Sequence, residues 1–131
     1  MNIRGHRIGS AEVESVVLKI REIKEVSAVA IKDTIDFEKI ILFVSMVNQE
    51  RNLKIIEKIE QKIIDNFGTY ALPKNIIILD DLPKTRSGKI LRRLLRTIYY
   101  NPNKKIGDIS TIINKKSIDD VMKKINKIKK S

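Results

Sequence analysis

The residues best suited to chemistry lie in one short basic stretch, residues 83–96. It is Pro-Lys-Thr-Arg-Ser-Gly-Lys-Ile-Leu-Arg-Arg-Leu-Leu-Arg, with six basic residues and no acidic one. Gly88 directly precedes Lys89, and glycine adopts backbone angles that other residues avoid, so this pair predicts a sharp bend that turns Lys89 outward. An ammonium is a compact point charge that can stabilise an anion. The stretch therefore predicts an exposed lysine aimed at a negatively charged reactant.

Two other interpretations of the stretch are a phosphate-binding loop and a solvated basic loop. The phosphate-loop motif needs a glycine five positions before Gly88 and a serine or threonine after the lysine. Those positions hold Pro83 and Ile90, so this motif is absent. A solvated basic loop stays open as an alternative on composition alone.

The positive charge of the chain is concentrated in two segments. The formal net charge is +11, residues 83–96 and residues 101–131 each carry +6, and the remainder sums to −1. A basic module that binds nucleic acid or acidic surfaces is one hypothesis, because phosphates attract basic residues without sequence recognition. Of the three Phe and three Tyr, only Tyr99 and Tyr100 lie beside the basic stretch. A platform for stacking bases is therefore poorly supported, and a nucleic-acid partner is not expected.

Length and composition indicate one domain over residues 1–131, with a core at residues 1–100 and a C-terminal extension at residues 101–131. The chain has 131 residues and no cysteine, which excludes disulfides and thiolate metal sites. It contains no run of eighteen apolar residues and no secretory signal pattern. We therefore expect a cytoplasmic protein with no membrane partner.

Hydrophobic spacing predicts an α+β fold. Ser10 is the expected N-cap of the first helix, and Asn52 and Gly68 are the expected start and stop of the second. The β-branched runs predict a small three-stranded mixed or antiparallel sheet covered by helices, and the extension carries the last helix. The strands are predicted at residues 26–32, 38–47 and 75–79, and the helices at residues 10–20, 53–67, 91–100 and 117–130.

Three ordered blocks resemble the C-terminal domain of AMP-forming acetyl-CoA synthetase, a member of the adenylate-forming enzyme superfamily. They are Gly-His-Arg-Ile-Gly-Ser-Ala-Glu-Val-Glu at residues 5–14, Pro-Lys-Thr-Arg-Ser-Gly-Lys-Ile at residues 83–90, and Gly-Asp-Ile-Ser-Thr-Ile at residues 107–112. The resemblance spans nearly the whole chain. It implies a ligase that makes acetyl-CoA from acetate, ATP and coenzyme A through acetyl-AMP.

The resemblance implies roles for particular residues. Lys89 is the catalytic lysine of the adenylation step and the regulatory N6-acetylation site. Arg7 matches an arginine that contacts nucleotide phosphate, and Gly5 matches the glycine of the CoA channel. Arg4 stands where a serine that contacts CoA is usual, which puts that contact in doubt. The basic residue expected to hold the CoA nucleotide falls at Ile64, with Lys62 nearby.

The resemblance also implies cofactors and partners. The cofactors are ATP or AMP, coenzyme A and Mg²⁺, and a family metal site maps to the main chain at Leu18, Ile20 and Ile23. The partners are a lysine acetyltransferase and deacetylase acting on Lys89, and the large N-terminal domain that holds ATP and acetate. That domain is expected to be absent here, so the chain alone is expected to be inactive. A relic fragment without catalytic function is the alternative.

Overall fold

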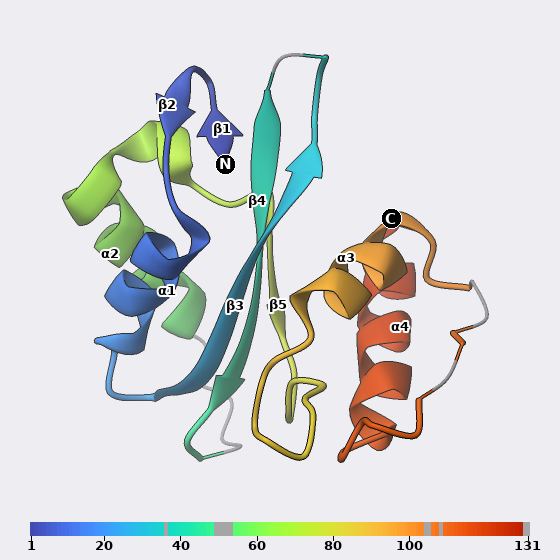
Figure 1. The fold of residues 1–131 in the computed structure, drawn as a ribbon. Coiled ribbons are helices and arrows are strands. Elements are labelled where there is room, and N and C mark those ends of the chain that lie inside the picture. Colours follow the sequence, from blue (N-terminus) through green and yellow to red (C-terminus); the bar gives the residue numbers. More distant parts are fainter. Residues whose placement is uncertain (36, 49–53, 104–105, 108, 130–131) are drawn as a thin grey trace.

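A three-stranded mixed sheet forms the centre of the structure, with helices against both of its faces (Figure 1). The computed structural model describes residues 1–35, 37–48, 54–103, 106–107 and 109–129. The strand order is β3 (Ile23–Lys32), β4 (Glu38–Met46) and β5 (Asn75–Ile78). β3 pairs antiparallel with β4, and β5 pairs parallel with β4. The predicted α+β class and mixed sheet are confirmed.

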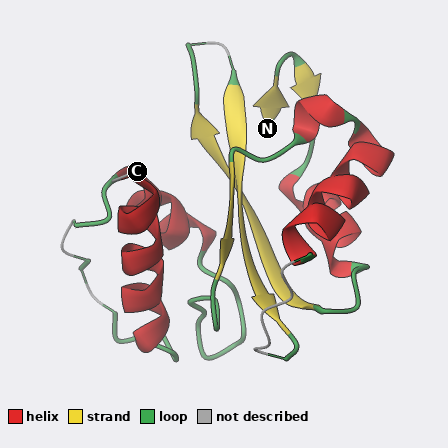
Figure 2. Cartoon of the chain, turned by 180° about the vertical axis from the view of Figure 1, so that it is seen from behind, coloured by secondary structure: helices red, strands yellow, loops and turns green. Residues whose placement is uncertain are grey.

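Two helices cover each face of this sheet (Figure 2). α1 (Ser10–Leu18) and α2 (Ile55–Phe67) cover one face. α3 (Arg92–Tyr100) and α4 (Lys116–Lys129) cover the other face, and both helices pack into one core with the sheet. Among the described residues, no helix is long and apolar enough to cross a membrane.

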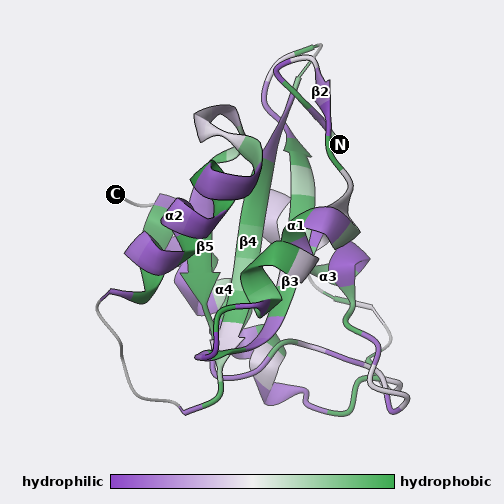
Figure 3. Cartoon of the chain, turned by 90° about the vertical axis from the view of Figure 1, so that its left-hand side faces the viewer, coloured by the Kyte–Doolittle hydropathy of each residue, from purple (hydrophilic) through white to green (hydrophobic). Residues whose placement is uncertain are grey.

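β4 is apolar from Ile40 to Val44, where both of its faces are buried. Successive side chains of a strand point to opposite faces. Ile40, Leu42 and Val44 therefore enter the core under α1 and α2, whereas Ile41 and Phe43 enter the core under α3 and α4. Figure 3 shows the apolar strands between helices that carry hydrophilic residues on their outer faces. This central strand fixes the positions of all surrounding elements.

Two details of the helices differ from the sequence-based expectations. Gly9, and not Ser10, occupies the N-cap position of α1. In α2, Ile55, Ile59 and Ile63 are the buried residues, whereas Ile56, which the predicted stripe included, is 40% exposed. A helix has 3.6 residues per turn, so a choice between adjacent isoleucines depends on how the helix rotates against the sheet.

The predicted end of α2 is confirmed. Phe67 is the last helical residue and Gly68, the predicted stop, is the C-cap, with a φ of 109° that favours glycine. A short 3₁₀ helix, η1 (Thr69–Ala71), follows directly. The predicted start at Asn52 and the first apolar residue Leu53 lie outside the described residues.

A small hairpin precedes α1. β1 (Asn2–Ile3) pairs antiparallel with β2 (His6–Arg7). Arg4 and Gly5 form the two-residue loop, with φ of 51° and 85°. Positive φ at both loop positions is the geometry that matches the twist of a tight hairpin. Gly5 adopts it without strain, whereas Arg4 is held there against its preference.

Candidate functional site

Lys89 lies at the end of a tight hairpin made by the basic stretch. Lys84 pairs antiparallel with Ile90, and the Thr85 amide donates to the Lys89 carbonyl at 2.9 Å. The Gly88 amide donates to the Thr85 carbonyl at 2.9 Å, and Gly88 has a φ of 89°. This is a three-residue loop closed by a glycine in the left-handed region. The bend predicted at Gly88 is confirmed, although α3 begins only at Arg92.

The tip of this hairpin presents unneutralised positive charge. Arg86 and Lys89 are exposed, and no acidic side chain in the described part of the chain forms an ion pair with either. A hollow of about 710 Å³ beside the hairpin is lined by Arg86, Lys115 and Lys116, among others. Lys89 is not among the residues that line this hollow. The tip of the hairpin carries two exposed cations, Arg86 and Lys89.

The stem of the hairpin carries a partly buried ion cluster. The Lys84 ammonium lies 2.9 Å from Glu25 Oε2 and 2.5 Å from Asp81 Oδ1. Burial alone would lower the pKa of Lys84, but hydrogen bonds to Asp81 and Glu25 outweigh it and raise that pKa. Burial likewise opposes ionisation of Asp81, yet hydrogen bonds from Lys84 and Asn114 hold the Asp81 pKa below its ordinary value. Lys84 is thus a fixed structural cation, in contrast to Lys89.

Arg4, Gly5 and Arg7, the other predicted site residues, lie together on the β1–β2 hairpin, and all three are exposed. Adding a Cβ atom at Gly5 would meet nothing within 4 Å, so the space above this glycine is open. The Gly5 amide donates to Asn2 Oδ1 at 3.0 Å, which closes the loop. The hairpin therefore offers two cations beside an unobstructed backbone.

An aromatic contact brings the end of α2 to the β1–β2 hairpin. The rings of His6 and Tyr70 stack with centroids 4.0 Å apart. Tyr70 belongs to η1, which follows α2 and its residues Lys62 and Ile64. The segments that the sequence related to CoA are therefore joined at one end of the molecule. The stacking of His6 on Tyr70 could not be predicted from the sequence, because the two residues are far apart in the chain.

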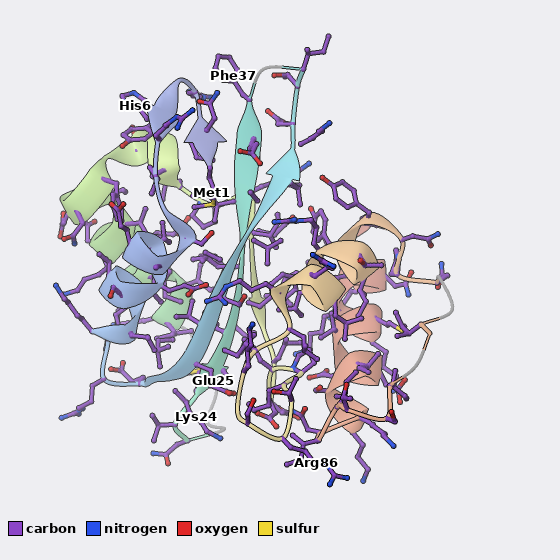
Figure 4. The ribbon with its side chains drawn as sticks, in the orientation of Figure 1. Met1, His6, Lys24, Glu25, Phe37 and Arg86 are labelled. Atoms are coloured by element: carbon purple, nitrogen blue, oxygen red, sulfur yellow. The ribbon has the colours of Figure 1, made fainter. Side chains whose placement is uncertain are left out.

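The two hairpins lie at opposite ends of the molecule. Figure 4 shows His6 of the β1–β2 hairpin at one end and Arg86 of the Lys89 hairpin at the other. Glu25, on β3, lies close to the second hairpin in the same view. The structure therefore does not bring Lys89 to Arg4, Gly5 and Arg7. It divides the predicted site residues into two separate surfaces.

The metal site predicted at Leu18, Ile20 and Ile23 would have to use main-chain carbonyls, because these side chains carry no oxygen. The Ile20 carbonyl accepts the Ile23 amide at 3.0 Å. Hard cations prefer several oxygen ligands. Among the described residues, no group of three or more His, Cys, Asp or Glu is placed to hold a metal.

The three arginines of α3, Arg92, Arg93 and Arg96, are all exposed, and the side chains of two of them also bond to neighbouring elements. Arg92 makes a two-pronged ion pair with Glu14 of α1, and the hydrogen bonds to Glu14 raise the Arg92 pKa. Arg96 Nε donates to the Ala30 carbonyl of β3 at 3.1 Å. Only Arg93 is exposed without such a contact in the described part of the chain. These arginines hold the segment after Lys89 against the sheet.

Comparison with known proteins identifies the family. The family model of the AMP-binding enzyme C-terminal domain matches residues 12–89, more than half of the chain. The chain belongs to this family. The match ends at Lys89, and the predicted resemblance is confirmed.

Curated relatives are acetyl-CoA synthetases of much greater length. Acetyl-coenzyme A synthetase 2 of Candida albicans is 34% identical over 125 residues, which cover 93% of this chain and 19% of that protein. Acetyl-coenzyme A synthetase of Penicillium chrysogenum is 32% identical over 126 residues, which cover 96% of this chain and 19% of that protein. This chain therefore spans about a fifth of the length of these relatives, and it corresponds to the C-terminal domain of acetyl-CoA synthetase-like enzymes.

Solved structures share the fold. An acyl-CoA synthetase from Brucella canis has a TM-score of 0.66 and 32% identity, covering 76% of this chain and 19% of that one. Acetoacetyl-CoA synthetase from Streptomyces lividans has a TM-score of 0.73 and 22% identity, covering 93% of this chain and 18% of that one. The second comparison shows that the fold common to both proteins reaches into the C-terminal extension.

Proposed function

We propose that this chain is the lid domain of an AMP-forming acetyl-CoA synthetase. A large domain, joined to it or supplied as a separate chain, would hold ATP and acetate. The lid would present one surface for adenylation and another for thioester formation. Membership of the AMP-binding enzyme C-terminal domain family and the similarity to acetyl-CoA synthetases support this assignment.

Lys89 would serve the first half-reaction. An oxygen of acetate attacks the α-phosphorus of ATP, the bond from that phosphorus to the β-phosphate oxygen breaks, and acetyl-AMP and pyrophosphate form. Negative charge from the carboxylate and the phosphates gathers in this transition state. An ammonium aimed there from an exposed hairpin stabilises it electrostatically. No carboxylate in the described part of the chain competes for this ammonium.

The β1–β2 hairpin would serve the second half-reaction. The thiol sulfur of coenzyme A attacks the acetyl carbon, its proton leaves to solvent or a base, and the bond to AMP breaks. Gly5 would let the pantetheine arm pass close to the backbone, because no side chain fills that space. Arg7 would contact a nucleotide phosphate, and Arg4 would attract the phosphates of coenzyme A. Guanidinium groups suit phosphate through paired hydrogen bonds.

The observation that carries this proposal is the placement of the two hairpins at opposite ends of the molecule. A large domain facing the end that carries Arg86 would meet the Lys89 hairpin, and one facing the end that carries His6 would meet the β1–β2 hairpin (Figure 4). A rotation of the lid between these orientations would exchange the two surfaces. Lys89 is also the proposed site of N6-acetylation, which would remove the charge that adenylation needs.

A chimeric enzyme tests this function. In Candida albicans acetyl-coenzyme A synthetase 2, the C-terminal domain is replaced by this chain, and acetyl-CoA formation from acetate, ATP and coenzyme A is measured. We expect activity in the chimera and a loss of about 100-fold or more with Lys89→Ala, the scale for removing one preorganised charge-stabilising group. Arg93→Ala removes an exposed cation four residues further on and serves as the charge-matched control. Full activity with Lys89→Ala would refute the role of Lys89.

A further inference from the structure

The C-terminal extension adds a third strand-like segment to the Lys89 hairpin. Ile112 pairs antiparallel with Thr85, and the Ile113 amide donates to the Lys84 carbonyl at 3.0 Å. The segment thus hydrogen-bonds along the outer edge of the hairpin stem. The family model that matches residues 12–89 does not reach this segment.

Asn114, the next residue, uses its whole amide group to hold the stem. Its Oδ1 accepts the Lys84 amide at 3.0 Å. Its Nδ2 donates to Asp81 Oδ2 at 2.6 Å and to the Leu82 carbonyl at 2.7 Å. One side chain therefore bonds to Asp81, Leu82 and Lys84, which lie in the segment that leads from β5 into the hairpin.

The stem is tied in turn to the sheet. Glu25 of β3, which binds the Lys84 ammonium, also accepts the Ser45 hydroxyl of β4 at 2.8 Å. The side chains of Lys84 and Glu25 are only 19% and 13% exposed. Charge-assisted hydrogen bonds in such partly buried places are stronger than neutral ones at the surface. The stem is therefore clamped between the sheet and the extension, whereas the tip with Arg86 and Lys89 is open.

We propose that Asn114 is a positioning residue for Lys89. Its side-chain amide is engaged with the stem, and it fixes the stem whose tip carries the lysine. A displacement of about 1 Å in a reacting group can cost about 100-fold in rate, so a rigid stem matters for a single aimed ammonium. This inference rests on the proposed function of Lys89.

Hydrogen exchange on the 131-residue chain tests the clamp without any activity. In Asn114→Ala, we expect the amides of Thr85, Gly88 and Leu91 to exchange about tenfold faster or more, because local opening follows the loss of stem hydrogen bonds. Amides of β3 and β4 should keep their protection. Asn126→Ala is the matched control, since this asparagine lies on α4 and bonds only to Asn103 at 3.3 Å among its described contacts.

The outcomes of this arm are distinct. Unchanged exchange in the hairpin would overturn the proposal. If Asn114→Ala does not fold, Asn114→Asp replaces it. The carboxylate keeps an oxygen that accepts the Lys84 main-chain amide, but it cannot donate to Asp81 or to the Leu82 carbonyl. Faster exchange in that variant supports the clamp, and unchanged exchange overturns it.

The chimera gives the second arm. We expect Asn114→Ala to lower the rate constant of acetate-dependent ATP–pyrophosphate exchange about tenfold or more, with the KM for ATP unchanged. Thioester formation from supplied acetyl-AMP should be unaffected, a split that general loss of structure would not produce. An equal fall in both half-reactions, or a fall in neither, would overturn the positioning role. An unsubstituted chimera without activity would instead refute the proposed function, while hydrogen exchange would still decide whether Asn114 holds the hairpin.

Discussion

Glu14 joins three elements, so its removal is expected to destabilise the fold strongly. The side chain is 8% exposed. Its Oε2 accepts the Ala28 amide of β3 at 2.8 Å, and the carboxylate also binds Arg92 of α3. Glu14→Ala therefore leaves the buried Ala28 amide without this partner and removes the ion pair between α1 and α3.

The magnitude follows from these two losses. An unsatisfied buried N–H costs about 1–3 kcal/mol. The Arg92 side chain is 43% exposed, so water can solvate the freed guanidinium, and its lost ion pair adds only about 0–1 kcal/mol. We expect a decrease of about 2–3 kcal/mol in the free energy of unfolding. With a urea dependence of about 1–3 kcal/mol per M, the unfolding midpoint should fall by about 0.7–3 M.

Urea unfolding followed by circular dichroism measures this shift. Glu14→Gln keeps an acceptor for the Ala28 amide and removes the charge, so its loss should be smaller, about 1 kcal/mol. Ser15→Ala changes the adjacent exposed residue of the same helix and should stay within about 0.5 kcal/mol of the unsubstituted chain. A Glu14→Ala midpoint equal to that of Ser15→Ala would refute the reasoning.

Three further predictions concern the core, the hairpin and pH. Ile59→Ala should lower the free energy of unfolding by about 2–5 kcal/mol, because Ile59 is fully buried. Ile56→Ala, on the exposed side of the same helix, should lower it much less. Equal urea unfolding midpoints for the two variants would contradict the observed rotation of α2. Gly88→Ala should lower the free energy of unfolding by about 1–2 kcal/mol, because Gly88 has a positive φ that alanine disfavours. No steric clash adds to this loss, since a Cβ atom there would meet nothing within 4 Å. An unchanged thermal unfolding midpoint would contradict this loop geometry. The lowered Asp81 pKa stabilises the fold above the ordinary value of 3.8, and this stabilisation is lost as the pH falls through the folded-state pKa. Asp81→Asn should therefore flatten the decrease in unfolding free energy below about pH 4, as measured by urea unfolding at several acidic pH values, and an equally steep decrease would contradict it.

The main elements could be predicted because their signals are local. The runs around β3, β4 and β5 are rich in β-branched residues, and the helices carry apolar residues at helical spacing, so neighbouring residues alone determine these assignments. The bend before Lys89 was predictable for the same reason, since Gly88 is adjacent to it. The β1–β2 hairpin was not, because Arg4 in its loop has no intrinsic preference for the positive φ it adopts.

Contacts between distant segments could not be predicted from local patterns. Glu14 and Arg92 are 78 residues apart, and each looks like an ordinary surface charge in its own helix. Asn114 lies more than thirty positions from Asp81 and Leu82, in an extension whose sequence indicates only a link before the last helix. The division of the candidate site into two hairpins likewise depends on strand order and on which helices cover each face. Those features follow from the packing of the whole domain.

The most direct test of the proposal that the two hairpins serve different half-reactions is to measure each half-reaction separately in the chimera. Lys89→Ala should abolish acetate-dependent ATP–pyrophosphate exchange and leave thioester formation from supplied acetyl-AMP intact. Gly5→Leu, which fills the open space above the β1–β2 loop, should do the reverse. If both substitutions slow the same half-reaction, the two surfaces do not have the separate roles proposed for them.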